Sequence, residues 1–196
     1  MRNRSYHHGD LRAALLDQAE LTLREKGAAA LSLRELARDL DVSHAAPSRH
    51  FKDRRALLDA LAMVGFERMT AVLIGADPGS GAGFRARVEA LARATVDFAV
   101  GEPELLALMF SRKQDTDALD EVHEAWMRLA APMYAVIADG QRTGDVHAGD
   151  VERIAFAAFV AVHGVANLAS IGVVAENEIP QSLGDALEHL IRGLKP

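Results

Sequence analysis

The chain has 196 residues, 49% of them hydrophobic and 26% charged, a balance typical of a globular protein of one or two domains, which excludes disordered and collagen-like chains. The absence of cysteine excludes disulfide scaffolds, thiolate zinc sites and cysteine nucleophiles, and it predicts a reducing, cytoplasmic location. The formal net charge of −6 hides a gradient, because residues 1–55 carry eleven Lys/Arg against eight Asp/Glu whereas residues 56–196 carry eleven against twenty.

Apolar residues recur at helical spacing along almost the whole chain, and no alternating strand pattern competes with it. We expect a first helix with Asp10 as its N-cap and its end at Gly27. The segment Ser32-Leu-Arg-Glu35 is a capping box that opens a short second helix. A third short helix should run from Ser43 to about His50, and a longer one should follow the N-cap Asp53.

Residues 75–83 are rich in glycine and should form a loop. Further helices are expected at about 84–100, 103–112, 117–141, 150–175 and 180–194. The fold class is therefore all-α, with a boundary between two domains near residue 60: an N-terminal domain at 1–60 and a C-terminal domain at 61–196.

The stretch from Ile154 to Ala175 carries no formal charge and is long enough to cross a bilayer. It is rich in alanine, contains His163 and Asn167, and has acidic rather than basic flanks. These features favour a buried helix over a membrane span, and we expect no membrane partner. Residues 1–8 are polar and contain no apolar core, so we expect no secretory signal in them.

The helix that begins after Ser32, a turn at residues 41–43 and a second short helix form a helix-turn-helix pattern. Asp41 suits the turn because aspartate tolerates left-handed backbone. Val42, Pro47 and Phe51 should face inward. Small residues would then let the outer face enter a major groove, where Arg49 can bind guanine O6 and N7. The same spacing fits an αα-hairpin with a solvated charged face, and spacing alone leaves both interpretations open.

Residues 32–43, followed by His44-Ala-Ala-Pro-Ser-Arg-His-Phe51 and Arg54-Arg-Ala-Leu-Leu58, resemble the DNA-binding domain of the TetR family of transcriptional regulators. The resemblance covers about residues 6–60. It implies a three-helix domain whose third helix lies in the major groove, with Arg54 at the position of a phosphate-binding lysine. Serine stands at position 48, where the family usually has an aromatic residue, and Asp41 replaces the usual glycine of the turn. The residues expected to contact operator DNA are Ser32, Arg34, Ser43, His44, Ala45, Ser48, Arg49, His50, Lys52 and Arg54.

The C-terminal half should bind a small-molecule effector and form a homodimer, as the resemblance implies. The segment from Phe159 to Leu168 resembles the His-Gly stretch of the WHG-type C-terminal subgroup, without its tryptophan. Large apolar residues of this half can form either a core or a pocket, and His163 and Asn167 can be either pocket groups or a satisfied buried pair. The residues expected to line the pocket are Phe98, Met109, Phe110, Trp126, Met127, Phe159, His163 and Asn167.

The last two predicted helices suit a dimer interface built from four helices, although both could also pack within one chain.

No metal-ligand, phosphate-loop or nucleophile pattern is complete, so we expect no catalytic residues, no metal, no cofactor and no enzyme activity. The favoured function is a homodimeric repressor that binds a palindromic operator and is released by a small molecule. An α-helical hydrolase and a non-specific DNA-binding protein are the alternatives.

Overall fold

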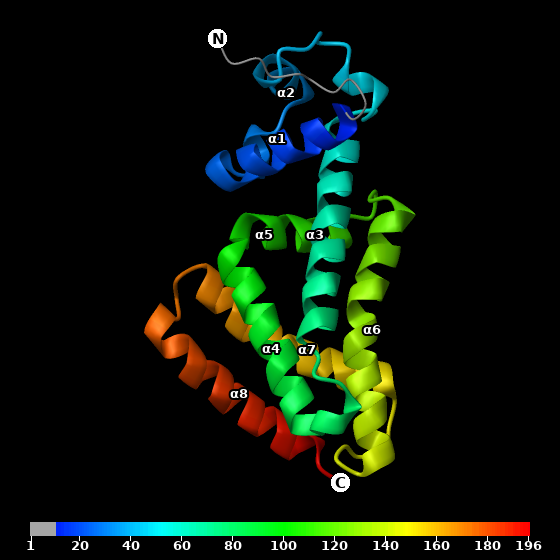
Figure 1. Ribbon diagram of the computed structural model, residues 1–196, viewed down its shortest axis with the longest axis vertical. Helices are drawn as coiled ribbons and strands as arrows, with labels where there is room; N and C mark the ends of the chain where they lie inside the picture. The colour runs from blue at the N-terminus through cyan, green and yellow to red at the C-terminus, as the bar shows by residue number, and fades with distance from the viewer. Residues whose placement is uncertain (1–10) are drawn as a thin grey trace. The chain divides into compact units, whose positions relative to one another are not determined.

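The computed structural model describes residues 11–196, and these residues form helices and no strand (Figure 1). The all-α prediction is confirmed, while the expected N-cap Asp10 lies outside the described residues. The α-helices are α1 (Leu11–Lys26), α2 (Leu33–Asp39), α3 (Arg54–Ala76), α4 (Phe84–Gly101), α5 (Pro103–Gln114), α6 (Asp120–Thr143), α7 (Val151–Ser170) and α8 (Ile179–Leu194). Single 3₁₀ turns are η1 (Ala28–Ala30), η2 (Pro47–Arg49), η3 (Ser80–Ala82) and η4 (Glu176–Glu178).

One predicted helix end is wrong: α7 stops at Ser170 instead of continuing to about residue 175. Gly172 adopts φ 74°, a left-handed conformation that glycine reaches without steric cost. The amide of Gly172 then donates to the carbonyl of Ala169, and that of Val173 to the carbonyl of Leu168. These bonds satisfy the last carbonyls of the helix and end it.

The chain divides into two compact units. The first extends to Gly65 and also includes Glu104–His123, and the second comprises Phe66–Pro103 and Glu124–Pro196. Helix α5 therefore belongs almost entirely to the first unit, although the sequence places it far from α1 and α2.

An ion pair lies within the core of the first unit. Arg112 of α5 donates from Nε to Oδ1 of Asp59 on α3 at 2.6 Å, and it also pairs with Asp115. Asp59 is 1% exposed and Arg112 is 6% exposed. Burial of these two charges is tolerable because each faces the other at hydrogen-bond distance.

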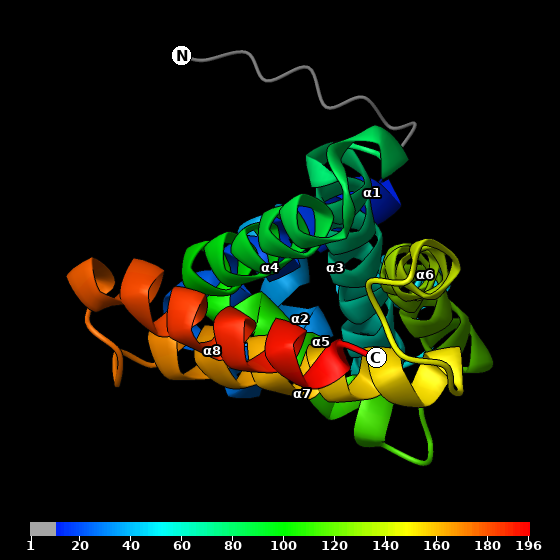
Figure 2. The same ribbon diagram turned by 90° about the horizontal axis from the view of Figure 1, so that it is seen from below.

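In the second unit, α7 packs against α4 and α8, and Figure 2 shows α7 and α8 side by side. The apolar stripe of α8 (Leu183, Leu187, Ile191 and Leu194) is buried within this unit. Arg87 of α4 donates to both carboxylate oxygens of Asp77 and to Asp139 on α6. The hydrogen bonds from Arg87 hold the pKa of Asp77 below its usual value.

Candidate DNA-binding surface and ligand pocket

The turn after α2 is built around Asp41, the one non-glycine residue of the described chain with a positive φ, at 53°. The amide of Asp41 donates to the carbonyl of Arg38, and the amide of Val42 donates to that of Ala37. These bonds close the end of α2 and turn the chain sharply, as left-handed residues do at helix ends. The left-handed turn expected at Asp41 is confirmed.

The start of α2 differs from the predicted capping box. Ser32 is the N-cap, with extended backbone, but its side chain makes no capping hydrogen bond. Glu35 accepts a hydrogen bond from Arg38 at 2.9 Å, within the same helix. Leu31 and Leu36 on either side of the cap are both buried. The apolar residues expected around the cap are therefore buried, but the expected reciprocal hydrogen bonds of the box are absent.

The expected short helix at residues 43–50 is a single 3₁₀ turn, Pro47–Arg49, flanked by turns. Pro47 has no N–H, so the carbonyl of Ser43 cannot receive the i+4 bond of an α-helix. It accepts instead from the amide of Ala46 at 2.9 Å, and the amide of Arg49 donates to Ala46 in the same i+3 pattern. The prediction of a regular helix was wrong, and Pro47 is the physical reason.

The orientation of Pro47 and Phe51 is as predicted, while Val42, which was also expected to face inward, is half-buried. Pro47 and Phe51 are buried, and the guanidinium of Arg12 lies 5.4 Å from the centre of the Phe51 ring. The other side is exposed and carries Ser43, His44, Ala45, Ser48, Arg49 and His50. The side chains of Arg34 on α2 and of Lys52, just after Phe51, are also exposed. The structure thus gives unit 1 an outward-facing, basic helix-turn-helix surface.

Arg54 makes contacts that the sequence did not predict. Its Nε donates to the carbonyl of Leu31 at 2.8 Å, and its Nη2 donates to the carbonyl of Ala28 at 2.6 Å. Arg54 therefore connects the first residue of α3 to the linker between α1 and α2. Next to it, Asp53 caps α3 by accepting from the amide of Ala56.

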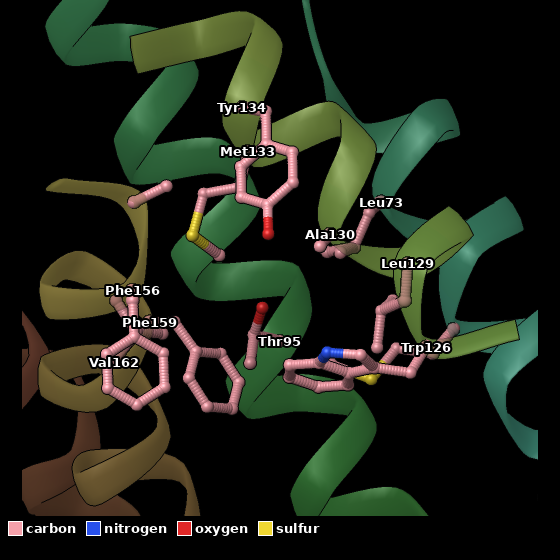
Figure 3. Close-up of a pocket in the computed structure, with 12 residues that line it drawn as sticks. Leu73, Thr95, Trp126, Leu129, Ala130, Met133, Tyr134, Phe156, Phe159 and Val162 are labelled. Atoms are coloured by element: carbon pink, nitrogen blue, oxygen red, sulfur yellow. The ribbon is translucent and has the colours of Figure 1, made fainter. Parts of the chain in front are cut away.

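The second unit contains an apolar pocket, shown in Figure 3, with a volume of about 40 Å³. Its walls come from α3, α4, α6 and α7, and we call it the aromatic lobe. It is lined by Met69, Leu73, Thr95, Trp126, Leu129, Ala130, Met133, Tyr134, Ala155, Phe156, Phe159 and Val162. Trp126 and Phe159 stack edge to face with ring centres 5.3 Å apart.

The polar groups of the aromatic lobe are uncharged. Figure 3 shows the hydroxyls of Thr95 and Tyr134 pointing into the space between the walls. The Thr95 hydroxyl donates to the carbonyl of Leu91 at 2.8 Å, so its oxygen can accept from a ligand. Burial, together with the nearby Glu152, raises the pKa of the Tyr134 hydroxyl. Tyr134 therefore stays protonated at neutral pH and can donate a hydrogen bond.

A second cavity of about 40 Å³ lies in the same unit, and we call it the aliphatic lobe. Its lining contains no aromatic ring and consists of Leu73, Val88, Leu91, Ala92, Thr95, Met133, Val136, Ile137, Ala158, Val162, Leu190 and Leu194. Leu73, Thr95, Met133 and Val162 belong to both lobes. The two lobes are therefore neighbours that share a wall.

The structure distributes the predicted pocket residues over several places. Trp126 and Phe159 line the aromatic lobe. Phe98 is buried on α4 outside both lobes, and Met109 and Phe110 belong to α5 in unit 1. Met127 is 40% exposed on α6.

The polar pair of α7 lies outside the pocket walls. The ring of His163 stacks on Phe159 at 5.0 Å, and burial lowers the pKa of His163. Asn167 is exposed one turn further along α7. The sequence analysis missed Thr95 and Tyr134 as pocket groups, although helical spacing places Tyr134 two turns after Trp126. No group of His, Asp or Glu in residues 11–196 could hold a metal ion.

A helix-turn-helix unit joined to a helical unit with an apolar pocket defines a class of ligand-responsive DNA-binding regulators. Residues 15–61 match the family model for bacterial regulatory proteins of the tetR family, and residues 88–194 match the model for the tetracyclin repressor-like C-terminal domain. The chain belongs to the TetR family, and it is a DNA-binding transcriptional regulator by fold.

Solved structures resemble the whole chain. A protein of unknown function from Rhodococcus sp. RHA1 is 44% identical, with a TM-score of 0.89 over 98% of this chain and 100% of that one. A tetR-family regulatory protein from Rhodococcus RHA1 is 20% identical, with a TM-score of 0.71 over 93% and 96%. The regulator FadR from Bacillus subtilis, in complex with stearoyl-CoA, is 14% identical, with a TM-score of 0.73 over 93% and 99%. A search of curated proteins found no match.

Proposed function

We propose that the chain is a cytoplasmic, homodimeric transcriptional repressor that binds a palindromic operator and is released when a small molecule enters the pocket of unit 2. The observation that carries this proposal is the outward, basic face of residues 43–52 in unit 1. Arg49 is the longest side chain at the centre of that face, and arginine can fork to guanine O6 and N7. The hydroxyl and cationic groups around it supply phosphate contacts that fix the register on DNA.

The proposed dimer interface is the exposed apolar side of α7. Phe156, Val160 and Leu168 are exposed on this helix, and Ile171 and Val173 are exposed just beyond its end. The four-helix interface expected from the sequence included the α8 stripe, but that stripe is already buried in its own unit. We therefore assign the apolar part of the interface to α7. A contiguous exposed apolar strip of this kind marks an association surface.

Release by an effector requires a difference in ligand affinity between two conformations. Each tenfold shift in operator occupancy needs about 1.4 kcal/mol of such coupling. Phe156 supports a link between ligand and dimer, because it lines the pocket and also belongs to the exposed apolar side of α7. A ligand that moves this ring changes the surface offered to the partner.

The function is tested by selecting genomic fragments with the purified protein at physiological salt. An inverted repeat among the selected fragments supports the repressor proposal, since a two-fold dimer reads two equivalent half-sites. Uniform recovery of fragments would contradict it and indicate non-specific DNA binding. Turnover of an ester or amide by the protein would indicate the hydrolase alternative.

Replacing Arg49 with alanine should relax base preference at one position of each half-site. A bidentate contact from arginine to guanine contributes about 1–3 kcal/mol of discrimination against the wrong base. The measurement is the binding-site logo from repeated selection with the variant. Arg34→Ala is the control, because Arg34 is exposed on α2 next to residues 43–52. This variant should weaken binding to all DNA sequences equally. An unchanged logo for Arg49→Ala would refute base reading by Arg49.

Arg54 should behave as both a phosphate contact and a structural link. Arg54→Lys keeps the charge but cannot hold the carbonyls of Ala28 and Leu31 together, so it should lower the free energy of unfolding by about 1–2 kcal/mol.

Arg54→Ala should also weaken DNA binding evenly across sequences and flatten the salt dependence by about one unit of slope per half-site. Urea unfolding and binding titrations at several salt concentrations measure both effects. A loss confined to one operator sequence would contradict the phosphate role.

A further inference from the structure

The two lobes of unit 2 differ in chemistry and share four lining residues, so they lie next to each other. The aromatic lobe carries Trp126, Phe159 and two hydroxyl groups, whereas the aliphatic lobe contains no ring and, apart from the shared Thr95, no polar side chain. No Lys, Arg, His, Asp or Glu among residues 11–196 lines either lobe. The site therefore has one end suited to an uncharged polar group and another suited to saturated hydrocarbon.

We propose that the effector is an uncharged amphiphile with a hydroxyl, ester or amide head in the aromatic lobe and an alkyl tail in the aliphatic lobe. The proposal rests on the proposed effector site and specifies the chemical class of its ligand. Tyr134 donates to an oxygen of any of these head groups, and Thr95 accepts from the O–H of a hydroxyl or the N–H of an amide, as their positions in Figure 3 allow. A carboxylate or phosphate head would lose its hydration without gaining an ion partner.

The shape of the site favours a chain over a fused ring system. Each lobe has a volume of only about 40 Å³, whereas pockets that already accommodate drug-sized ligands measure roughly 300–1,000 Å³. A methylene chain can enter such narrow spaces through small side-chain movements. Met133 lies in the shared wall, and methionine is unbranched and readily repacks. Rotation of Met133 would join the two lobes for the tail.

The experiment measures binding of primary alcohols from hexanol to dodecanol to the full chain. Trp126 is the only tryptophan of the chain and lines the aromatic lobe, so its fluorescence reports occupancy of that lobe. Each added methylene should tighten the Kd by about three- to fourfold until the tail lobe is full. Carboxylates of matched chain length should bind at least about tenfold more weakly.

Two alanines of α7 give a matched pair of variants. Ala155 lines only the aromatic lobe, Ala158 lines only the aliphatic lobe, and both are buried about one turn apart. Ala158→Leu should end the gain in affinity at a shorter chain length, so that the longest alcohols lose the most affinity. Ala155→Leu should weaken every alcohol. Thermal unfolding without ligand checks the fold of each variant, and valine replaces leucine at both positions if the larger side chain prevents folding.

The outcomes separate this inference from the proposed function. Three results would overturn the two-lobed site. The affinity for alcohols could be independent of chain length, carboxylates could bind as tightly as alcohols, or the Ala155 and Ala158 variants could have equal effects. Failure of every alcohol to bind while the operator is bound would also overturn it and leave DNA recognition in place. Alcohols that bind as expected but do not release the operator would support the site and contradict effector release.

Discussion

Replacing Arg112 with methionine is expected to lower the free energy of unfolding by about 3–5 kcal/mol, because the change leaves the buried carboxylate of Asp59 without its cation. Asp59 is 1% exposed, and Arg112 Nε lies 2.6 Å from its Oδ1. Methionine matches the apolar stem of arginine in length, so the loss reports the charge rather than a cavity. The reciprocal change, Asp59→Ala, should cost less, since Arg112 keeps its pair with Asp115.

The measurement is urea unfolding followed by circular dichroism, with the double variant Asp59→Leu/Arg112→Met as the decisive comparison. Removing both charges should restore most of the lost stability, because a buried pair replaced by apolar side chains is often neutral or stabilising. Arg38→Met is the control, since the Arg38–Glu35 pair is exposed on α2 and exposed pairs contribute only about 0–1 kcal/mol. If Arg112→Met lowered the free energy of unfolding as little as Arg38→Met does, the buried ion pair would not be needed for stability.

This ion pair shows where sequence reasoning stops. Asp59 and Arg112 are 53 positions apart, and each looks like an ordinary charge on an amphipathic helix. Only the tertiary packing of α5 with α3 in unit 1 brings them together and buries them. The same packing removes Met109 and Phe110 from the expected pocket. Helical periodicity identifies the buried side of a helix, but it does not identify the unit that buries it.

Helix positions were predicted well because they depend on local signals. The helix expected from about residue 150 illustrates this, because Asp150 Oδ1 accepts from the amides of Glu152 and Arg153 and so sets the start of α7. The recognition segment was predicted less well because one local signal, the missing N–H of Pro47, overrode the helical pattern around it. The outward position of Arg49 survived this error, since the buried Pro47 and Phe51 fix which side of the segment faces the core.

Replacing Ile171 with aspartate is expected to dissociate the proposed dimer and to weaken operator binding by at least about 100-fold. Ile171 is 63% exposed in this chain but would be covered by a partner, and each copy of the variant would then bury an unpaired carboxylate at the interface. Such a charge costs several kcal/mol, while about 2.7 kcal/mol suffices for a 100-fold loss. The affinity that remains is that of one monomer bound to one half-site.

Ile74→Asp provides a control of the same chemistry. Ile74 is 62% exposed and lies near the end of α3, as Ile171 lies at the end of α7, so any unfavourable interaction with a helix C-terminus is similar in both variants. Sedimentation velocity gives the oligomeric state, and titration of an operator and of an isolated half-site gives the affinities. Ile171→Asp should sediment as a monomer and bind operator and half-site about equally, whereas Ile74→Asp should behave like the unaltered chain. If the Ile171→Asp protein remained dimeric and bound the operator with full affinity, the dimer interface would have to lie elsewhere than on α7. The ring of Phe156 would then contact no partner surface and could not transmit ligand binding to the dimer.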